Sequence, residues 1–328
     1  SIISRAICMV CINQCLLSIT DMDITTRAVA NTGLGAPGLI YVLKKINTGI
    51  GLTGGSTLTV NGSLIVNSKG PNPITLSGSK STITAEGIGV AASSVSCAPG
   101  TCTPAPKTNM PQGPDPLASV PPPTFALSCN HTAKYVPETG KTTTINPGVY
   151  CGGLKISGKK TIVNFSPGNY IIMNGFEISQ SATVTGANVM IYNTGNVTIG
   201  GVKYDYGPFT VSQSGTTVEL SGIIDSGHGP YEGMVFFQDR NNPNTVDFGS
   251  GASVELNGII YINKAPGATW SYSNSDTALQ FQSNSATAAN EYTLLVVWSI
   301  EFGGGPAFTM YSSFTGGQSP LKHVSLVE

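Results

Sequence analysis

Charge is scarce in this chain. Only 10% of its 328 residues are Asp, Glu, Lys or Arg, against roughly 25% in an average domain. The 16 basic and 17 acidic residues leave a net charge of −1, and three of the basic residues are arginines. Such a chain offers no field for nucleic acid or an anionic membrane, and no arginine cluster for phosphate. We therefore expect no nucleic-acid partner.

Recognisable catalytic and metal-binding patterns are also missing. There is no phosphate-binding glycine loop and no Ser-His-Asp order, and the three histidines are scattered. Cys8-x-x-Cys11 lacks the second ligand pair of a zinc site. Asp21-Met22-Asp23 lacks the glycine and the final glutamate of a calcium loop. The sequence predicts no metal and no cofactor.

Long hydrophobic runs are absent as well. The stretch from Ala6 to Ile19 is apolar but shorter than the ~20 residues that span a membrane, and polar residues interrupt it. We expect no membrane span. We interpret Ile7 to Ile19 as a buried strand-like segment that either caps one end of the folded chain or docks on another copy of the protein. The candidate docking residues there and near the C-terminus are Ile7, Val10, Ile12, Leu16, Leu17, Ile19, Val324, Leu326 and Val327.

An internal repeat is the strongest positive signal. Leu154-Lys155-Ile156-Ser157 recurs 22 residues later as Phe176-Glu177-Ile178-Ser179. A second template begins at Gly55, Gly215 and Gly251 (GSTLTVNGSL, GTTVELSGII and GASVELNGII). Short alternating segments at a fixed period indicate a β-solenoid, in which each coil buries its apolar row on the next coil. We predict an all-β solenoid with a period of about 22 residues.

The same alignment predicts which residues face inward. It pairs Thr161-Ile162 with Thr183-Val184, and Tyr170 with Tyr192. The predicted interior row contains Ile156, Ile162, Ile178 and Val184.

Seven cysteines fit an exported protein better than a metal site. Cys97 and Cys102 flank a short turn, and Cys129 and Cys151 bracket a loop rich in proline and threonine. We predict these two pairs to be disulfides. The remaining three cysteines near the N-terminus are reduced core residues, or one of them bonds to another chain.

Five segments follow from the pattern. Residues 1–48 are irregular and cap the rod or dock a subunit, 49–96 form the first coils, and 97–148 carry eleven prolines. Because proline lacks the N–H donor of a ladder, we expect this excursion to run outside the coil. Residues 149–312 form the main β-helix, and 313–328 form a tail. Phe236-Phe237 and Leu294 to Val297 are apolar on both sides, which indicates strands covered on both faces.

Several ordered motifs resemble the C-terminal region of TadG-like proteins, which are associated with the tight-adherence (Flp) pilus-assembly system. They are GVYCGGLKISG from Gly148, SPGNYII from Ser166, TGANV from Thr185, DPLASVP from Asp115 and GPYEGMVFFQDR from Gly229. The resemblance covers roughly residues 50 to 300. It implies a right-handed parallel β-helix at or outside a bacterial envelope.

Two observations keep an enzyme in view, because many parallel β-helices act on acidic polysaccharides. Asp239-Arg240 is the one pair of charges that suggests a catalytic site. In the structural alternative, the two residues bond each other or cap backbone groups at a corner. Tyr170 and Tyr192 present either a shelf for sugars or tyrosines packed in the core.

The favoured function is a non-enzymatic, secreted structural protein of the bacterial cell surface, assembled head to tail as a filament. Low surface charge and two open solenoid ends motivate it. The alternatives are a monomeric surface adhesin that binds carbohydrate or a host surface, a pilus-assembly-associated protein, and a polysaccharide lyase or hydrolase.

Overall fold

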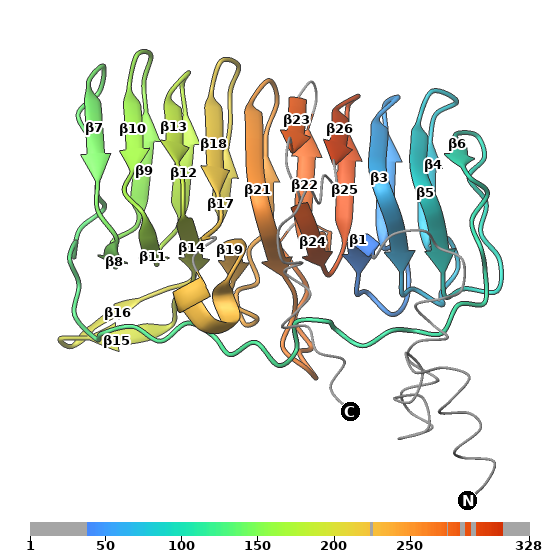
Figure 1. Ribbon diagram of the computed structural model, residues 1–328, viewed down its shortest axis with the longest axis horizontal. Coiled ribbons are helices and arrows are strands. Elements are labelled where there is room, and N and C mark those ends of the chain that lie inside the picture. The colour runs from blue at the N-terminus through green and yellow to red at the C-terminus, as the bar shows by residue number, and fades with distance from the viewer. Residues whose placement is uncertain (1–37, 224–225, 274, 283–285, 290–292, 311–328) are drawn as a thin grey trace, which may run out of the picture.

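The computed structural model describes residues 38–223, 226–273, 275–282, 286–289 and 293–310. Within these ranges the chain forms parallel strands, one antiparallel hairpin and one short 3-10 helix. The strands stack in three rows that wind around a common interior, so the molecule is a parallel β-helix shaped as a rod (Figure 1). No helix in the described part of the chain is long and apolar enough to cross a membrane.

The first row, here called the open face, contains ten strand segments in spatial order. They are β7 (Thr142–Ile145), β10 (Ile162–Phe165), β13 (Thr183–Gly186), β18 (Thr217–Ser221), the first half of β21 (Ser253–Ile262), β23 (Ala286–Ala289), β26 (Ala307–Met310), the first halves of β3 (Thr57–Val66) and β5 (Thr82–Val90), and β6 (Thr101–Thr103). Nine intervals of about 4.8 Å make this row roughly 43 Å long.

The second row, here called the covered face, follows the open face along each coil. It contains β8 (Gly148–Tyr150), β11 (Gly168–Ile172), β14 (Val189–Asn193), β19 (Met234–Gln238), the second half of β21, β24 (Thr293–Val297), β1 (Gly38–Val42), and the second halves of β3 and β5.

The third row, here called the charged face, closes each coil. It contains β9 (Leu154–Ser157), β12 (Phe176–Ser179), β17 (Phe209–Val211), β20 (Val246–Phe248), β22 (Leu279–Gln282), β25 (Ile300–Gly303), β2 (Ile50–Thr53) and β4 (Ile74–Ser77). Outside the rows lie the hairpin of β15 (Val197–Ile199) and β16 (Val202–Tyr204), and the 3-10 helix η2 (Ser226–Tyr231).

Alternation along each strand explains the interior. Side chains of successive strand residues point to opposite faces, so every second residue enters the rod. Val, Ile and Leu fill most inward positions, and phenylalanines stack along the axis on the charged-face side. The ring centroids of Phe176 and Phe209 lie 4.8 Å apart, and those of Phe281 and Phe302 lie 5.0 Å apart. One continuous core therefore joins coils that are distant in sequence.

The predicted interior row is confirmed at three positions and wrong at one. Ile156, Ile178 and Val184 are fully buried, but Ile162 is 37% exposed. Val163, not Ile162, pairs with Val184 and enters the core. The corner before β13 is one residue shorter than the corner before β10, so the period there is 21 residues. Because side chains alternate with a period of two, this slip turns Ile162 outward.

The coils do not stack in chain order. β24, β25 and β26, the last strands of the described chain, pair with β1, β2 and β3, the first strands. The N-terminal coils thus continue the rod beyond the C-terminal coils, and β1 and β26 lie in its middle (Figure 1). The coils at the two ends of the rod come from residues 74–107 and 129–157. An end-to-end assembly would therefore use these internal residues.

A seam joins the first and last coils without any covalent continuity. At its corner, Gly54 has φ +68°, and a Cβ there would come within 2.8 Å of the Cα of Gly304. The backbone N–H of Gly305 donates to the Ser56 hydroxyl at 3.3 Å. Because glycine has no Cβ, the corners at Gly54 and Gly304 pack closely. The first and last coils therefore pair through their backbones, as consecutive coils of the rod do.

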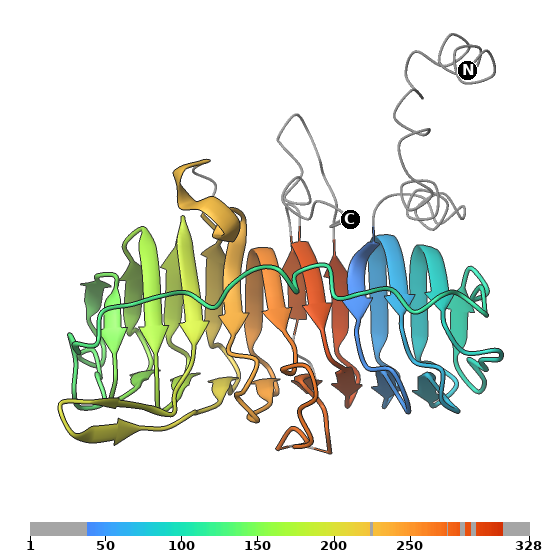
Figure 2. The ribbon, with the colours of Figure 1, turned by 90° about the horizontal axis from the view of Figure 1, so that it is seen from below.

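Residues 107–127, here called the strap, return the chain from one end of the rod to the other. They run along the outside of the covered face, as both ribbon views show (Figures 1 and 2). The excursion outside the coil is shorter than residues 97–148, because β6 lies in one end coil and β7 in the other.

Candidate functional site

Both predicted disulfides form, and they lie at opposite ends of the rod. Cys97–Cys102 has a Cα–Cα distance of 5.9 Å and packs against the core beside the outermost strands β5 and β6. Cys129–Cys151 has a Cα–Cα distance of 5.7 Å. It joins the segment that follows the strap to the residue that follows β8. The strap therefore runs between two end coils, each of which carries a disulfide. Disulfides persist in oxidising compartments.

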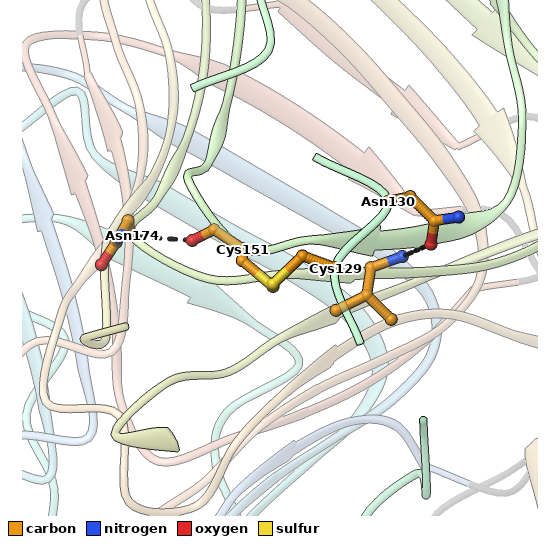
Figure 3. Close-up of a disulfide and its surroundings, with 5 residues drawn as sticks. Cys129, Asn130, Cys151 and Asn174 are labelled. Carbon is orange, nitrogen blue, oxygen red and sulfur yellow. Dashed lines mark hydrogen bonds between the residues drawn. A yellow bond between two sulfur atoms is a disulfide. The ribbon is translucent and has the colours of Figure 1, made fainter. Parts of the chain in front are cut away.

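Side-chain amides hold the backbone around the second disulfide (Figure 3). The side-chain oxygen Oδ1 of Asn130 accepts a hydrogen bond from the backbone N–H of Val149 at 2.7 Å. The Asn174 amide donates to the carbonyl of Cys151 at 3.1 Å. These bonds tie the disulfide to the next coil.

Aromatic rings close the interior at the same end. His131 stacks on Tyr150 with centroids 4.7 Å apart, and Tyr135 lies 4.3 Å from His131. The Tyr150 hydroxyl donates to the Asn146 carbonyl at 2.7 Å. Burial, and then the neighbouring Tyr135, raise the pKa of Tyr150 to about 12. The ring cluster shields the core where no further coil of the described chain covers it.

Arg240 is an anchor for the strap. Its guanidinium donates to the carbonyls of Leu117 and Val120 at 2.8 and 3.0 Å. It also donates to the Tyr261 hydroxyl at 2.7 Å and lies over the rings of Phe237 and Tyr261. Arg240 thus caps backbone groups, as expected, but these belong to the strap and not to a corner of the coil.

Asp115 anchors the strap from the other side. Its carboxylate accepts from the Tyr261 hydroxyl at 2.6 Å and from the Asn263 amide at 2.9 Å. Burial and the nearby Asp115 carboxylate raise the pKa of Tyr261 well above its usual value. Residues 115–121 and 229–240 thus contact each other although they are far apart in sequence.

Asp239 binds neighbours other than Arg240. Its carboxylate accepts from the Tyr192 hydroxyl at 2.9 Å and from the Thr194 hydroxyl at 2.7 Å. The Asn241 N–H donates to its other oxygen at 2.9 Å, which closes a corner. Burial, followed by the charge of Asp239, raises the pKa of Tyr192 well above its usual value. The expected bond between Asp239 and Arg240 is not among these contacts.

Tyr170 and Tyr192 do not form an external shelf for sugars. Both are buried, Tyr170 inside the coil and Tyr192 in the second core between the covered face and its covering segments. They are not equivalent positions, since Tyr170 pairs with Ile191 and Ile171 pairs with Tyr192. The alternative of packed tyrosines is confirmed.

A cluster of buried charges lies at the corner beyond the covered face, next to the seam. Asp276 pairs with Lys44 at 3.0 Å and with Lys264 at 2.6 Å. The Lys264 ammonium also lies 5.0 and 4.8 Å from the ring centroids of Trp270 and Trp298. Burial raises the pKa of Asp276, but the bonds from Lys264 and Lys44 outweigh it and bring the pKa below its usual value. The cluster links the first coils to the last.

Paired threonines on the open face form the most regular feature of the rod surface. At one end they occupy the outward positions of three neighbouring strands, and we call this set the threonine patch. It consists of Thr57 and Thr59 of β3, Thr82 and Thr84 of β5, and Thr101 and Thr103 of β6. Each is exposed or half-buried, while Leu58, Ile83 and Cys102 between them face the core.

The pairing is in register along two parallel rows. Thr57, Thr82 and Thr101 are Cα partners in one row, and Thr59, Thr84 and Thr103 in the other. Strand geometry sets a spacing of about 4.8 Å along the rod and about 6.8 Å between the rows. The patch is therefore a small two-dimensional lattice of identical side chains.

The rest of the open face keeps this pattern in part. Thr309 of β26 extends the second row on one side of the patch. At the far end, β7 and β13 again carry Thr-x-Thr, at residues 142–144 and 183–185. Glu219 and Glu255 interrupt the second row in the middle of the rod.

The charged face gives a useful contrast. Its main outward row runs Lys155, Glu177, Thr210, Asp247, Gln280 and Glu301. Lys155 and Glu177 form an ion pair at 2.9 Å, and the Gln282 amide donates to Asp247. Burial raises the pKa of Asp247, although the Gln282 bond opposes it. On the open face, by contrast, the threonine patch contains no charged side chain.

The sequence analysis missed the threonine patch, although a signal was present. Thr-x-Thr recurs at residues 57–59, 82–84, 101–103, 142–144 and 183–185. The candidate docking residues Ile7 to Ile19 and Val324 to Val327 lie outside the described residues. The part of the chain that the structure describes contains no group of His, Cys, Asp and Glu suited to hold a metal ion.

Comparison with known proteins adds no assignment. No protein-family model, curated protein or solved structure matches this chain.

Proposed function

We propose that this protein is a non-enzymatic rod that acts outside a bacterial cell and adheres to an extended, ordered surface through its open face. The single observation that carries the proposal is the threonine patch, with six identical side chains in two straight rows. A small soluble ligand contacts only one or two such side chains, whereas a solid with a repeating surface contacts all of them.

The other sides of the rod are less suited to this role. The covered face is occupied by the strap and its anchors, and the charged face carries Lys155 and three acidic residues in its outward row. The two disulfides are typical of an oxidising compartment, and the resemblance to TadG-like proteins supports a bacterial surface. Carbohydrate and host surfaces remain in the class of ordered surfaces to be tested.

The test is binding of the full chain to a panel of insoluble solids, measured by depletion from solution. Thr84→Lys places a strongly hydrated charge in the centre of the patch, and Thr210→Lys makes the same change on the charged face. We expect at least one solid to deplete the wild type and the Thr210 variant, but not the Thr84 variant. Binding that is equal in both variants would contradict the proposal.

A filament subunit is the second candidate, and the outer strands favour it. In the described chain, β6 pairs only with β5, and β7 pairs only with β10. Unpaired outer edges invite the addition of a strand from another copy. Stacking β7 of one copy on β6 of the next would continue the Thr-x-Thr rows across the junction. Such a head-to-tail contact does not close, so it produces a filament.

One substitution tests the filament. Ile162 N–H donates to the Lys141 carbonyl and Ser166 N–H to the Ile145 carbonyl, so the backbone of Thr144 faces the end of the rod. Thr144→Pro removes an edge donor without breaking a ladder bond within the rod. We expect fibres of the wild type in electron microscopy and none of the variant, with Thr144→Ser as the control. A wild type that stays monomeric at high concentration rules the filament out.

The proposal includes the absence of catalysis. Asp239 and Arg240 are held by different structural partners, Asp239 by Tyr192 and Thr194, and Arg240 by Tyr261 and the strap carbonyls. We expect no release of unsaturated or reducing ends from pectin-like or alginate-like substrates, with or without calcium. Turnover that survives purification and disappears in a folded Arg240→Lys variant would support the lyase instead.

A further inference from the structure

We propose that the ordered surface bound by the threonine patch is ice. This inference rests on the proposed function, since it names the solid that the open face contacts. Three properties of the patch lead to it: its lattice geometry, the chemistry of its side chains, and the groups that it lacks.

The geometry favours a crystalline partner. Thr82 in the middle strand has Thr57 and Thr101 as lateral partners, so the hydroxyl-bearing carbons repeat at every strand. Threonine is branched at Cβ and restricted at χ1, which limits the orientations of each hydroxyl and methyl. The Thr82 hydroxyl donates to that of Thr57 at 3.4 Å, a contact along one row. A rigid array of this kind fits a partner whose own atoms repeat in two directions.

Side-chain chemistry favours water as the partner. A threonine hydroxyl both donates and accepts, as a water molecule does, so it can replace water at a lattice position. Holding a liquid water molecule at a protein surface costs up to about 2 kcal/mol in entropy. Water in ice is already immobilised, so the array binds it without that cost.

The groups that are absent argue against other solids. Crystalline polysaccharides present sugar rings, which pack on flat aromatic side chains, and membranes attract cationic ones. The outward rows of β3, β5 and β6 contain neither, and the aromatic residues in the described part of the open face point inward. Glu86 lies beyond the rows at the bend of β5. An uncharged, non-aromatic hydroxyl lattice leaves ice as the best-matched solid.

The test is partition of the fluorescently labelled full chain into slowly growing polycrystalline ice. We expect the wild type and Thr210→Lys to be enriched in the ice, and Thr84→Lys to lose this enrichment about tenfold or more, as a disrupted central contact does. Both variants change an outward strand residue, and equal melting temperatures will show that both are folded. Exclusion of the wild type from ice, or equal enrichment of both variants, overturns the inference.

A gain-of-function variant and a second solid sharpen the result. Replacing Glu219 and Glu255 by Thr removes both acidic side chains from the second row and extends its Thr185 end by two threonines, and we expect stronger enrichment in ice. Crystalline chitin and cellulose are tested with the same set of variants. Binding to either solid that depends on Thr84, with exclusion from ice, overturns the inference and leaves the proposed function standing. Binding to none of these solids contradicts both.

Discussion

The open face and the covered face are built by the same strands. β3, β5 and β21 each run along the open face, turn a corner and continue along the covered face. Their inward residues are alike on both sides, but their outward residues differ. On the open face β3 carries Thr57 and Thr59 outward, whereas on the covered face β21 carries Ile259 and Tyr261 into the second core.

This contrast shows what decides an outward position in a β-helix. The period of two fixes which residues leave the interior, but not their chemistry. Where the strap returns over the rod, Leu117 and Val120 bury the outward residues, so these are apolar. Where no described segment returns, most outward side chains are polar, and threonine is the commonest of them. The predictions below test this difference, starting with the largest expected effect.

The inward and outward sides of the open face should differ most. Val163 is fully buried and Ile162 is 37% exposed. Val163→Asp places a charge in the core without a partner, and we expect a loss of about 4–5 kcal/mol in the free energy of unfolding. Ile162→Asp should cost less than about 1 kcal/mol. Urea unfolding of both variants measures the difference, and equal losses would show that the register at β10 is wrong.

The strap contact should come next. Leu117 is a strap residue that packs in the second core and is 2% exposed. Leu117→Asp should lower the free energy of unfolding by about 3–4 kcal/mol. Thr84→Asp, on the open face, should change it by about 0.5 kcal/mol or less. Thermal and urea unfolding report both. A neutral Leu117 variant would mean that the strap does not contribute to the stability of the covered face.

Removal of the strap anchor should have a smaller effect. Arg240→Ala leaves the carbonyls of Leu117 and Val120 without their donor. We expect a loss of about 2–3 kcal/mol and faster tryptic cleavage at Lys107, because the strap is then held less firmly. Arg240→Lys should retain part of the stability. Unchanged cleavage in the alanine variant would contradict the anchoring role.

The pH dependence of stability should show the smallest effect. The pKa of Asp276 is lowered in the folded protein, so its unfolded form binds a proton at higher pH than the folded form does. Its contribution is therefore complete above the ordinary aspartate pKa of about 3.9 and is lost as the pH falls from there through the folded pKa.

A matched variant isolates this contribution. Asp276→Asn should flatten the fall in stability between about pH 5 and pH 2, measured by urea unfolding. Asp205→Asn is the control, since the Lys203–Asp205 pair is 60% and 63% exposed. An Asp276 variant that keeps the full pH dependence would place the responsible carboxylate elsewhere.

Local signals in the sequence were sufficient for much of the fold. The repeat predicted the β-solenoid, and the inward positions of Ile156, Ile178 and Val184 followed from strand alternation. Cysteine spacing predicted both disulfides, because each pair flanks a segment short enough to bring its ends together. Apolar runs on both sides of a strand correctly predicted a face covered by other chain segments.

Other features depend on contacts between distant residues. A corner shorter by one residue moved Ile162 to the surface, and the sequence alignment could not distinguish that from a regular period. Arg240 was found as a suggestive charge, but its partners Leu117 and Val120 lie more than a hundred residues away. The Thr-x-Thr segments were present in the sequence, yet their alignment depends on which coils are neighbours.

The sequence alone determined the alternation of inward and outward residues and the cysteine pairs, because each depends on interactions within about one coil. The predicted uniform period of about 22 residues is wrong, since Ile162 and its partner Thr183 are 21 residues apart but Thr217 and its partner Ser253 are 36 apart. Only the tertiary structure decided the order of the coils. Any coil end with an open backbone edge and an apolar interior can receive another coil, so local physics does not select the partner. The pairing of β26 with β3 and the path of the strap along the rod fix which coils are neighbours. They thereby left one face covered and aligned the threonines on the other.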